Sequence, residues 1–434
     1  METAHRIFIF HNKPGPRHNY IAGFLGDSLG IEFSFTTETP GKGPLILYGM
    51  STGSDGIRIP DSGFLSETGI RRFVPDAEIK ENILLFHVAG NYDLPFDIFS
   101  AIFYLITRYE EYLPFEADSH GRFELAQSLA CKKGFHQEPV VDRWLMMLRD
   151  LIGQRFPEVN FPSKKFTFIS SLDIDSPWAF KNRRLGRNLP GLAKNLVQGK
   201  FSDFFYRLKV IRNRAVDPFD VYTFIDQTEN QFQFRSIFFF LLADDMKYDP
   251  NHSLHSEAFK ILIRELSDGH QAGIHPSYNS NNDNGKLNQE ISLFRSLTGR
   301  APELSRQHYL MLKLPDTYRR LIQHGISDDY SMGYASGVAF RAGTTLPFRF
   351  YDLKSEEETS LTVHPFTVMD VTLRQYMKLD PGQAAGVITD MIEKIRQVNG
   401  NFVSLWHNES LSEFGLWKGW RSVFTEMVRR AFDQ

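Results

Sequence analysis

Beyond residue 160, apolar runs that suit strands alternate with amphipathic runs that suit helices. The five strand-like runs are 166–174, 236–244, 272–276, 304–310 and 401–408. Helical spacing of apolar residues is found between them, over 256–268, 286–299 and 381–400. Strands that lack a polar alternation and are separated by helices are typical of a parallel sheet covered on both faces. We therefore predict a β/α domain over residues 161–434.

Residues 1–160 predict a smaller α/β domain, whose role the sequence does not define. Short apolar runs separated by turn residues predict strands at 6–10, 44–49 and 82–88. Helical spacing predicts helices over 97–113 and 140–156. The two prolines and polar residues of 156–166 mark the boundary with the second domain.

The segment 178–219 interrupts the alternation of strands and helices. It is rich in Lys and Arg, with Phe201, Phe204, Phe205 and Tyr206 among them. We predict a basic helical insertion that folds over the mouth of the second domain. Such a cover suits an acidic or sugar substrate, and an ordinary solvated helical face is an equal alternative.

Composition narrows the class of protein. The 434 residues are 42% hydrophobic and 23% charged, with a net charge of −3, which is typical of a globular protein of two or three domains. This balance gives no electrostatic reason to expect nucleic acid or an anionic membrane as a partner, and the basic stretch 181–200 is the exception. Cys131 is the single cysteine, which excludes a disulfide and a thiolate metal site. We see neither a signal peptide nor an apolar run of membrane-spanning length, so the prediction is a cytoplasmic protein without a membrane span.

Polar residues gather where the predicted strands of the second domain end. These residues are Asp173, Asp175, His275, Arg306, His308, His407 and Asn408. Because the carboxyl ends of parallel strands share one open edge, function in such folds collects there. That several strands bring titratable groups to the same end is stronger evidence than any single motif.

The residue types suit a divalent metal site. Carboxylates and imidazoles are the ligands of catalytic zinc, which predicts Asp175 and His275 as ligands. Strand alternation places Asp173 on the same side as Asp175, where it would act as a base, with His407 as the opposing acid. Simpler alternatives exist, because Asp-x-Asp is common at strand ends, His308 suits a buried core histidine and Arg306 suits an ordinary ion pair.

Four fragments in this order resemble the motifs of the polysaccharide deacetylase superfamily (NodB homology, carbohydrate esterase family 4). "SLDIDSP" resembles its opening Asp motif, and "GHQAGIHPSYNS" its second motif, with His275 at the first metal histidine. "SRQHYL" resembles the third, with Arg306 at the arginine that orients the base, and "VSLWHNES" the last, with His407 at the catalytic acid. The resemblance covers about 165–410 and implies a distorted (β/α) barrel in a divergent bacterial member with an extra N-terminal domain. It also implies metal-dependent removal of an acetyl group.

The chain departs from this family at the second metal histidine, whose place is taken by Asn279. Asn is a poor zinc ligand, so we predict that His308 supplies the third ligand, with weak or absent metal binding as the alternatives. Zinc is the predicted ion, and cobalt or another divalent ion would also suit the site. Segment 328–348 resembles a substrate-wall loop of the family, and its Asp329 is expected to hold His407 or Arg306.

Three functions are compatible with these residues. The first is a metal-dependent hydrolase that removes an acetyl group from an N- or O-acetylated carbohydrate or a sugar-containing precursor. The second is a hydrolase of the same superfamily that cleaves a C–N bond in a small amide or ureide. The third is a carbohydrate-binding or assembly protein whose site has decayed, which the presence of Asn279 favours.

Overall fold

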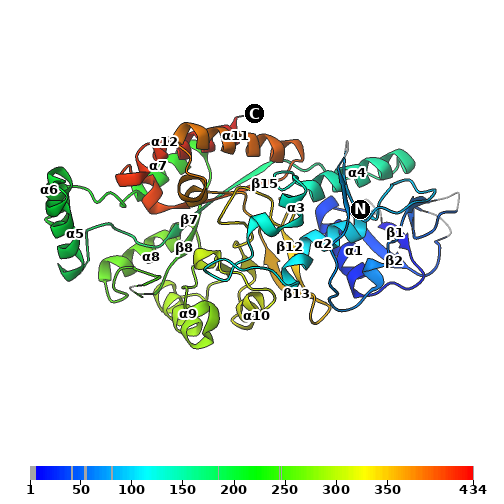
Figure 1. Cartoon of the computed structure of the whole chain (residues 1–434), viewed down its shortest axis with the longest axis horizontal. Helices are drawn as coiled ribbons and strands as arrows, with labels where there is room; N and C mark the ends of the chain where they lie inside the picture. The colour runs from blue at the N-terminus through cyan, green and yellow to red at the C-terminus, as the bar shows by residue number, and fades with distance from the viewer. Residues whose placement is uncertain are drawn as a thin grey trace.

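The computed structural model describes residues 6–40, 43–52, 56–79, 82–183, 185–243, 245 and 247–433, without the side chains of 185–187. Figure 1 shows three parts along the long axis of the molecule. The N-terminal α/β region lies at one end, a larger α/β region fills the centre, and two helices, α5 and α6, stand at the other end.

The N-terminal region is built on a four-stranded sheet in the order β2-β1-β3-β4, with every neighbouring pair parallel. Its strands are β2 (Glu32–Thr36), β1 (Arg6–Phe10), β3 (Leu45–Tyr48) and β4 (Ile57–Ile59). Its main helices are α1 (Pro16–Leu29), α2 (Ile98–Ile106), α3 (Leu129–Lys132) and α4 (Val140–Arg155). The run predicted as a strand at 82–88 forms only β6 (Ile83–Leu85), which pairs with β5 (Ala77–Ile79) in a separate antiparallel hairpin.

The central region holds a sheet whose parallel strands alternate with helices along the chain, which confirms the α/β class. The parallel strands are β7 (Thr167–Ile174), β8 (Ile237–Phe240), β9 (Gln271–Ile274), β10 (Leu304–Ser305), β11 (Asp328–Asp329), β14 (Val368–Met369) and β15 (Asn401–His407). The helices between and after them are α7 (Tyr222–Phe232), α8 (Glu257–Gly269), α9 (Asn284–Thr298), α10 (Asp316–Gln323), α11 (Pro381–Gln397) and α12 (Trp420–Phe432).

The central sheet curls into a distorted barrel that backbone hydrogen bonds of residues 364–367 close. On one side, the Phe366 amide donates to the Met332 carbonyl, which follows β11, over 3.1 Å. On the other side, the Thr367 amide donates to the Val403 carbonyl in β15 over 3.0 Å. Side chains from separate strands and from the segment after β11, including Phe239 of β8, Leu405 of β15 and Tyr330, therefore meet in one interior cluster.

A hairpin of β12 (Phe348–Asp352) and β13 (Glu357–Val363) extends the sheet beyond β11 toward the N-terminal region. One hydrophobic cluster runs from the N-terminal sheet and α2 into this hairpin. A buried ionic network crosses the same junction. The Glu111 carboxylate accepts from Arg108 at 2.7 Å and from Arg341 at 2.6 Å, and all three side chains are almost fully buried. The division into two domains near residue 160 remains a prediction.

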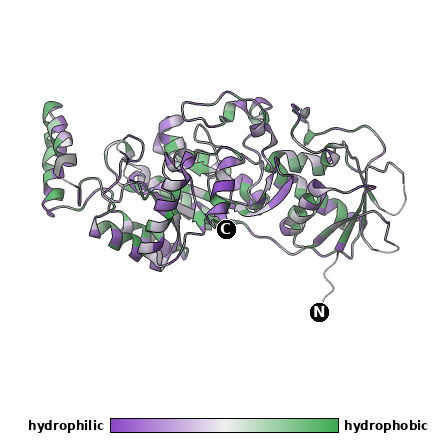
Figure 2. Ribbon diagram, turned by 90° about the horizontal axis from the view of Figure 1, so that it is seen from below, coloured by the Kyte–Doolittle hydropathy of each residue, from purple (hydrophilic) through white to green (hydrophobic). Residues whose placement is uncertain are grey.

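The basic insertion forms two helices, α5 (Leu185–Val197) and α6 (Phe201–Ile211). Figures 1 and 2 both show them projecting away from the barrel, whereas the sequence predicted that they cover its mouth. Across the described residues, no helix combines the length and the apolar character needed to cross a bilayer.

Candidate metal centre

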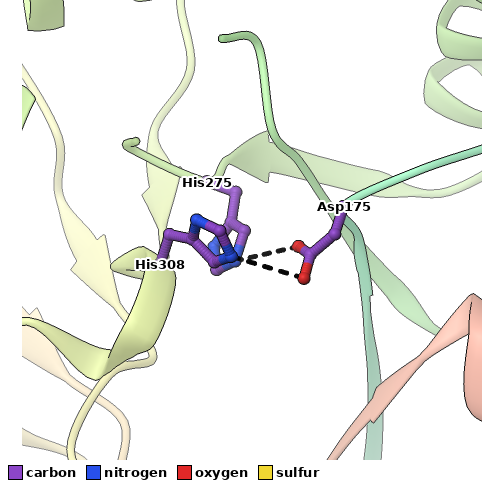
Figure 3. A group of neighbouring side chains, drawn as sticks. All are labelled: Asp175, His275 and His308. Atoms are coloured by element: carbon purple, nitrogen blue, oxygen red, sulfur yellow. Dashed lines mark ion pairs between the residues drawn. The ribbon is translucent and has the colours of Figure 1, made fainter. Parts of the chain in front are cut away.

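Three side chains from three barrel strands converge at the carboxyl edge of the sheet. Asp175 follows β7, His275 follows β9, and His308 follows β10. One ligand atom from each lies within 4.8 Å of the other two. Figure 3 shows both imidazole rings turned toward the Asp175 carboxylate, with His275 Nε2 at 3.3 Å from Oδ1 and His308 Nε2 at 3.4 Å from Oδ2.

A hydrogen bond behind each ring directs a nitrogen lone pair into the centre. His275 Nδ1 donates to the Arg306 carbonyl, because a carbonyl oxygen can only accept. His308 Nδ1 donates to the Asp249 carboxylate at 2.7 Å. When such a ring is neutral, as metal binding requires, its Nε2 is an unprotonated acceptor that faces Asp175. A carboxylate or carbonyl that fixes the histidine tautomer in this way is the usual support of a metal ligand.

A divalent cation would satisfy polar atoms of the centre that the surrounding side chains leave unsatisfied. In the described part of the chain, the buried atoms His275 Nε2 and Asp175 Oδ1 have no hydrogen-bond partner. When His275 is neutral, both atoms are acceptors and neither can satisfy the other, so a divalent cation between them would satisfy both. Ligand atoms held about 2.1 Å from a tetrahedral ion lie about 3.4 Å apart, close to the separations observed.

Asn279 lies outside this cluster. Its side-chain amide donates to Asp245 Oδ2 at 2.7 Å, which turns the group toward another carboxylate. His308 therefore occupies the place of the third candidate ligand, as the sequence predicted from the better donor strength of imidazole.

Asp173 is held beside the candidate ligands by Arg306. The Arg306 guanidinium donates to Asp173 Oδ1 at 2.8 Å and to Ser171 Oγ at 2.7 Å. It is fully buried and also packs 4.5 Å from the Phe239 ring centroid. The second oxygen of Asp173 lies 3.6 Å from His275 Nε2. One face of the carboxylate is thus fixed, and the other faces the metal centre.

His407 lies directly beside Asp173, on the neighbouring strand β15 and in register with it. Its Nδ1 and its backbone amide both donate to Asp370, at 2.8 and 2.7 Å, while Nε2 lies 3.7 Å from Asp175 Oδ2. Burial lowers the pKa of His407, but the carboxylates of Asp370, Asp175 and Asp173 outweigh it and raise the pKa well above its usual value. This environment favours the protonated imidazole, which is the form that a general acid requires.

The pKa shifts of the charged groups in the centre show which proton a bound metal ion would displace. Burial lowers the pKa of His308, but the carboxylates of Asp175 and Asp249 raise it to about 9. Burial raises the pKa of Asp175, but His308, His275 and His407 hold it well below its usual value. Without a metal, a proton on His308 balances the carboxylates, and binding of a divalent ion would displace it.

The centre opens into a cavity of about 440 Å³. Its walls combine polar and apolar side chains, including Arg122, Tyr309, Leu310, Met369, Tyr376 and Leu405. Arg122 comes from the N-terminal region, where the sequence showed no functional residue. Its guanidinium donates to the Tyr309 carbonyl at 2.7 Å and to the Tyr376 hydroxyl at 3.3 Å. The N-terminal region thus supports one wall of the pocket.

Sequence reasoning missed two carboxylates of the centre and misplaced a third. Asp249 follows β8 by several residues, and Asp370 directly follows the two-residue β14. The rule that functional groups gather at strand ends points to Asp370 once β14 is recognised. Asp329, expected near His407 or Arg306, instead accepts from the hydroxyls of Ser305 and Ser331.

Comparison with known proteins gives one family match, in the N-terminal part of the chain. Residues 7–157 match a family described as "Family of unknown function (DUF7033)". No curated protein matches the chain.

Solved polysaccharide deacetylases are among the structures to which this chain is similar, as its motifs predict. A Mycobacterium smegmatis protein provisionally described as a polysaccharide deacetylase is 14% identical, with a TM-score of 0.41 over 63% of this chain and 86% of the other. The Bacillus cereus polysaccharide deacetylase is 13% identical, with a TM-score of 0.29 over 62% and 88%. A Bacillus anthracis CE4 family pseudoenzyme is 7% identical, with a TM-score of 0.30 over 61% of each chain. Because these TM-scores are low, only the side chains of the site itself support a function.

Proposed function

We propose that this protein is a metal-dependent hydrolase that removes an acetyl group from an N- or O-acetylated carbohydrate or sugar-containing precursor. The observation that carries the proposal is the convergence of the Asp175, His275 and His308 acceptor atoms within 4.8 Å, two of which have no hydrogen-bond partner among the described residues. The flanking Asp173 and His407 supply a base and an acid.

Asp175, His275 and His308 would hold the ion, and zinc is the ion that best suits one carboxylate and two imidazoles. Such an ion supplies Lewis-acid chemistry, which polarises a carbonyl group and makes water more acidic. The polar residues at the bottom of the pocket place the acetyl group at this centre, while its apolar and aromatic walls suit the faces of a sugar ring.

Asp173 acts as the general base in this proposal. Its Oδ2 faces the candidate ligands, where it accepts a proton from the attacking water. The guanidinium of Arg306 stays on Oδ1 and keeps the carboxylate oriented throughout. Because Arg306 touches Asp173 and not the reacting atoms, it is a positioning residue.

His407 acts as the general acid. Its protonated Nε2 points into the pocket while Asp370 holds Nδ1, so the ring can deliver one proton to the departing nitrogen or oxygen. The base and the acid thus approach the acetyl group from two neighbouring strands, β7 and β15.

Metal analysis combined with acetate release tests the proposal. The full chain should bind one equivalent of zinc or cobalt and release acetate from an acetylated aminosugar oligomer only when metal is present. A panel that includes a cyclic amide separates deacetylation from cleavage of ureides. Stoichiometric metal without turnover of any acetylated sugar would contradict the proposed reaction, and absence of metal binding would favour a decayed site.

Replacing Asp370 with Asn should shift the pH dependence of amide hydrolysis. The Asp370 carboxylate raises the pKa of His407, so its neutralisation should lower that pKa. Activity that requires the protonated imidazole is lost as pH rises through this pKa, so the alkaline limb of the kcat/KM profile should move to lower pH. Asp328→Asn is the matched control, because Asp328 pairs with His364 at 2.7 Å and not with His407. An unmoved alkaline limb in Asp370→Asn would refute the assignment of His407 as the acid.

A further inference from the structure

The turn between α5 and α6 carries an unusual group of exposed apolar side chains. Val197 is 88% exposed, Phe201 is 58% exposed and Phe205 is 59% exposed. Phe201 and Phe205 are four residues apart on α6 and therefore lie on one face of that helix. We name Leu196, Val197, Phe201 and Phe205 the apolar tip.

Basic residues surround the apolar tip. Between residues 188 and 214 the sequence has a single acidic residue, Asp203, although the whole chain has a net charge of −3. Five basic side chains of this stretch are exposed: Lys194, Lys200, Lys209, Arg212 and Arg214. Lys194 and Lys200 lie within a few residues of Val197, so charge and apolar surface occur together at the turn.

The hairpin is firmly attached at its base. The Asp217 carboxylate accepts from the backbone amides of Ala179, Phe180 and Lys181 at 2.7–2.8 Å. The Arg207 guanidinium packs over the Phe180 ring at 4.2 Å from its centroid. The same guanidinium also packs against Gly191 of α5. The apolar tip is therefore presented on an ordered support and not on a loose loop.

We propose that the hairpin of α5 and α6 binds the surface of a bilayer that contains anionic phospholipid. Helices with Lys and Arg beside exposed Phe and Leu side chains bind at the boundary between headgroups and acyl chains. The basic side chains attract anionic headgroups, and the apolar tip inserts between them. This binding needs no spanning helix.

The shape of the hairpin favours a bilayer over other partners. The hairpin of α5 and α6 projects from the molecule, and a fluid bilayer adapts to a projecting group (Figures 1 and 2). Nucleic acid would engage the lysines and arginines through phosphates but would leave most of the apolar tip in water. Membrane binding accounts for both features of the hairpin.

The base of the hairpin adjoins the candidate metal centre. Ser176 directly follows Asp175. The Asn408 side-chain amide donates to the Ser176 carbonyl at 3.0 Å and also to the carbonyl of Phe219, at the far end of the insertion. A hairpin docked on a bilayer therefore keeps the carboxyl edge of the barrel close to the membrane. This placement is independent of the reaction proposed for the site.

Vesicle flotation of the full chain tests the proposal. The protein should float with vesicles of phosphatidylcholine and phosphatidylglycerol and not with phosphatidylcholine alone, and high salt should reverse binding. Each basic residue near an anionic surface contributes about fivefold to binding. The variant K194E/K200E/K209E should therefore bind on the order of 100-fold more weakly. V197S/F201S/F205S should lose at least about tenfold, because insertion of apolar groups contributes to binding.

K132E/K133E/K165E is the matched control, since it reverses three exposed lysines elsewhere and should bind vesicles like the parent protein. Circular dichroism and metal content should be unchanged in all three variants, because every replaced side chain is exposed. Equal binding to neutral and anionic vesicles, or equal losses in the control and the hairpin variants, would overturn the proposal. The proposal would also be overturned if the parent protein bound duplex DNA but no vesicles, and the serine variant retained that DNA binding.

Discussion

His308→Ala and His275→Ala proteins are expected to lose stoichiometric metal and, with it, hydrolytic activity. Each change removes an imidazole Nε2 from a centre where three ligand atoms lie within 4.8 Å of one another. Two remaining ligands hold a divalent ion poorly, since catalytic sites normally retain three protein ligands. Metal content after dialysis, followed by acetate release with added zinc, measures both effects.

Asn279→Ala is the matched control for His308→Ala. The Asn279 amide donates to Asp245, so its removal should leave metal content unchanged. Asp249→Asn should give an intermediate result, because loss of a carboxylate behind a ligating histidine typically costs about 10–100-fold in metal affinity. Full metal occupancy in His308→Ala together with metal loss in Asn279→Ala would show that the ligand set is wrong.

Asp173→Asn is expected to keep its metal and lose about 10²–10⁴-fold in kcat, the usual contribution of a general base. Asn retains the shape of Asp and can still accept from Arg306, but it cannot take a proton from water. Asp175, which remains, continues to supply the carboxylate ligand. Metal content and kcat on the same preparation check the two halves of this prediction.

His407→Ala should separate the acid from the base by its dependence on the leaving group. The amine of an amide substrate is a poor leaving group and needs the proton from His407. The leaving group of an activated aryl ester does not need this proton. The ester should therefore be hydrolysed nearly normally by His407→Ala but slowly by Asp173→Asn. Equal losses on both substrates in both variants, or normal activity in Asp173→Asn, would contradict the assignment of Asp173 as the base and His407 as the acid.

The sequence predicted the longer barrel strands and helices because burial on both faces leaves a clear pattern. β7 and β15, which carry Asp173 and His407, are the clearest cases. β11 and β14 have only two residues each, which is too short for any periodicity to appear, and the strand predicted over 304–310 forms only the two residues of β10. Their position depends instead on neighbouring strands, and sequence spacing does not encode that information.

The candidate site followed the same rule. Every residue singled out for catalysis or metal binding lies at the carboxyl edge of the sheet, because each directly follows or ends an apolar run. The supporting carboxylates Asp249 and Asp370 were missed, since one lies in a loop and the other follows a very short strand. Arg122 was not predictable, because its approach to the pocket depends on how the N-terminal region packs against the barrel.

The buried network of Arg108, Glu111 and Arg341 predicts that the N-terminal region and the barrel are retained together in evolution. Glu111 belongs to the N-terminal region and Arg341 to the barrel, and neither is exposed to water. A recombination event that transferred the barrel alone would remove the carboxylate with which Arg341 pairs. The apolar junction around β12 and β13 would be exposed at the same time. Selection should therefore pass the two halves on together, and homologous barrels that lack the N-terminal region should have no arginine at the position of Arg341.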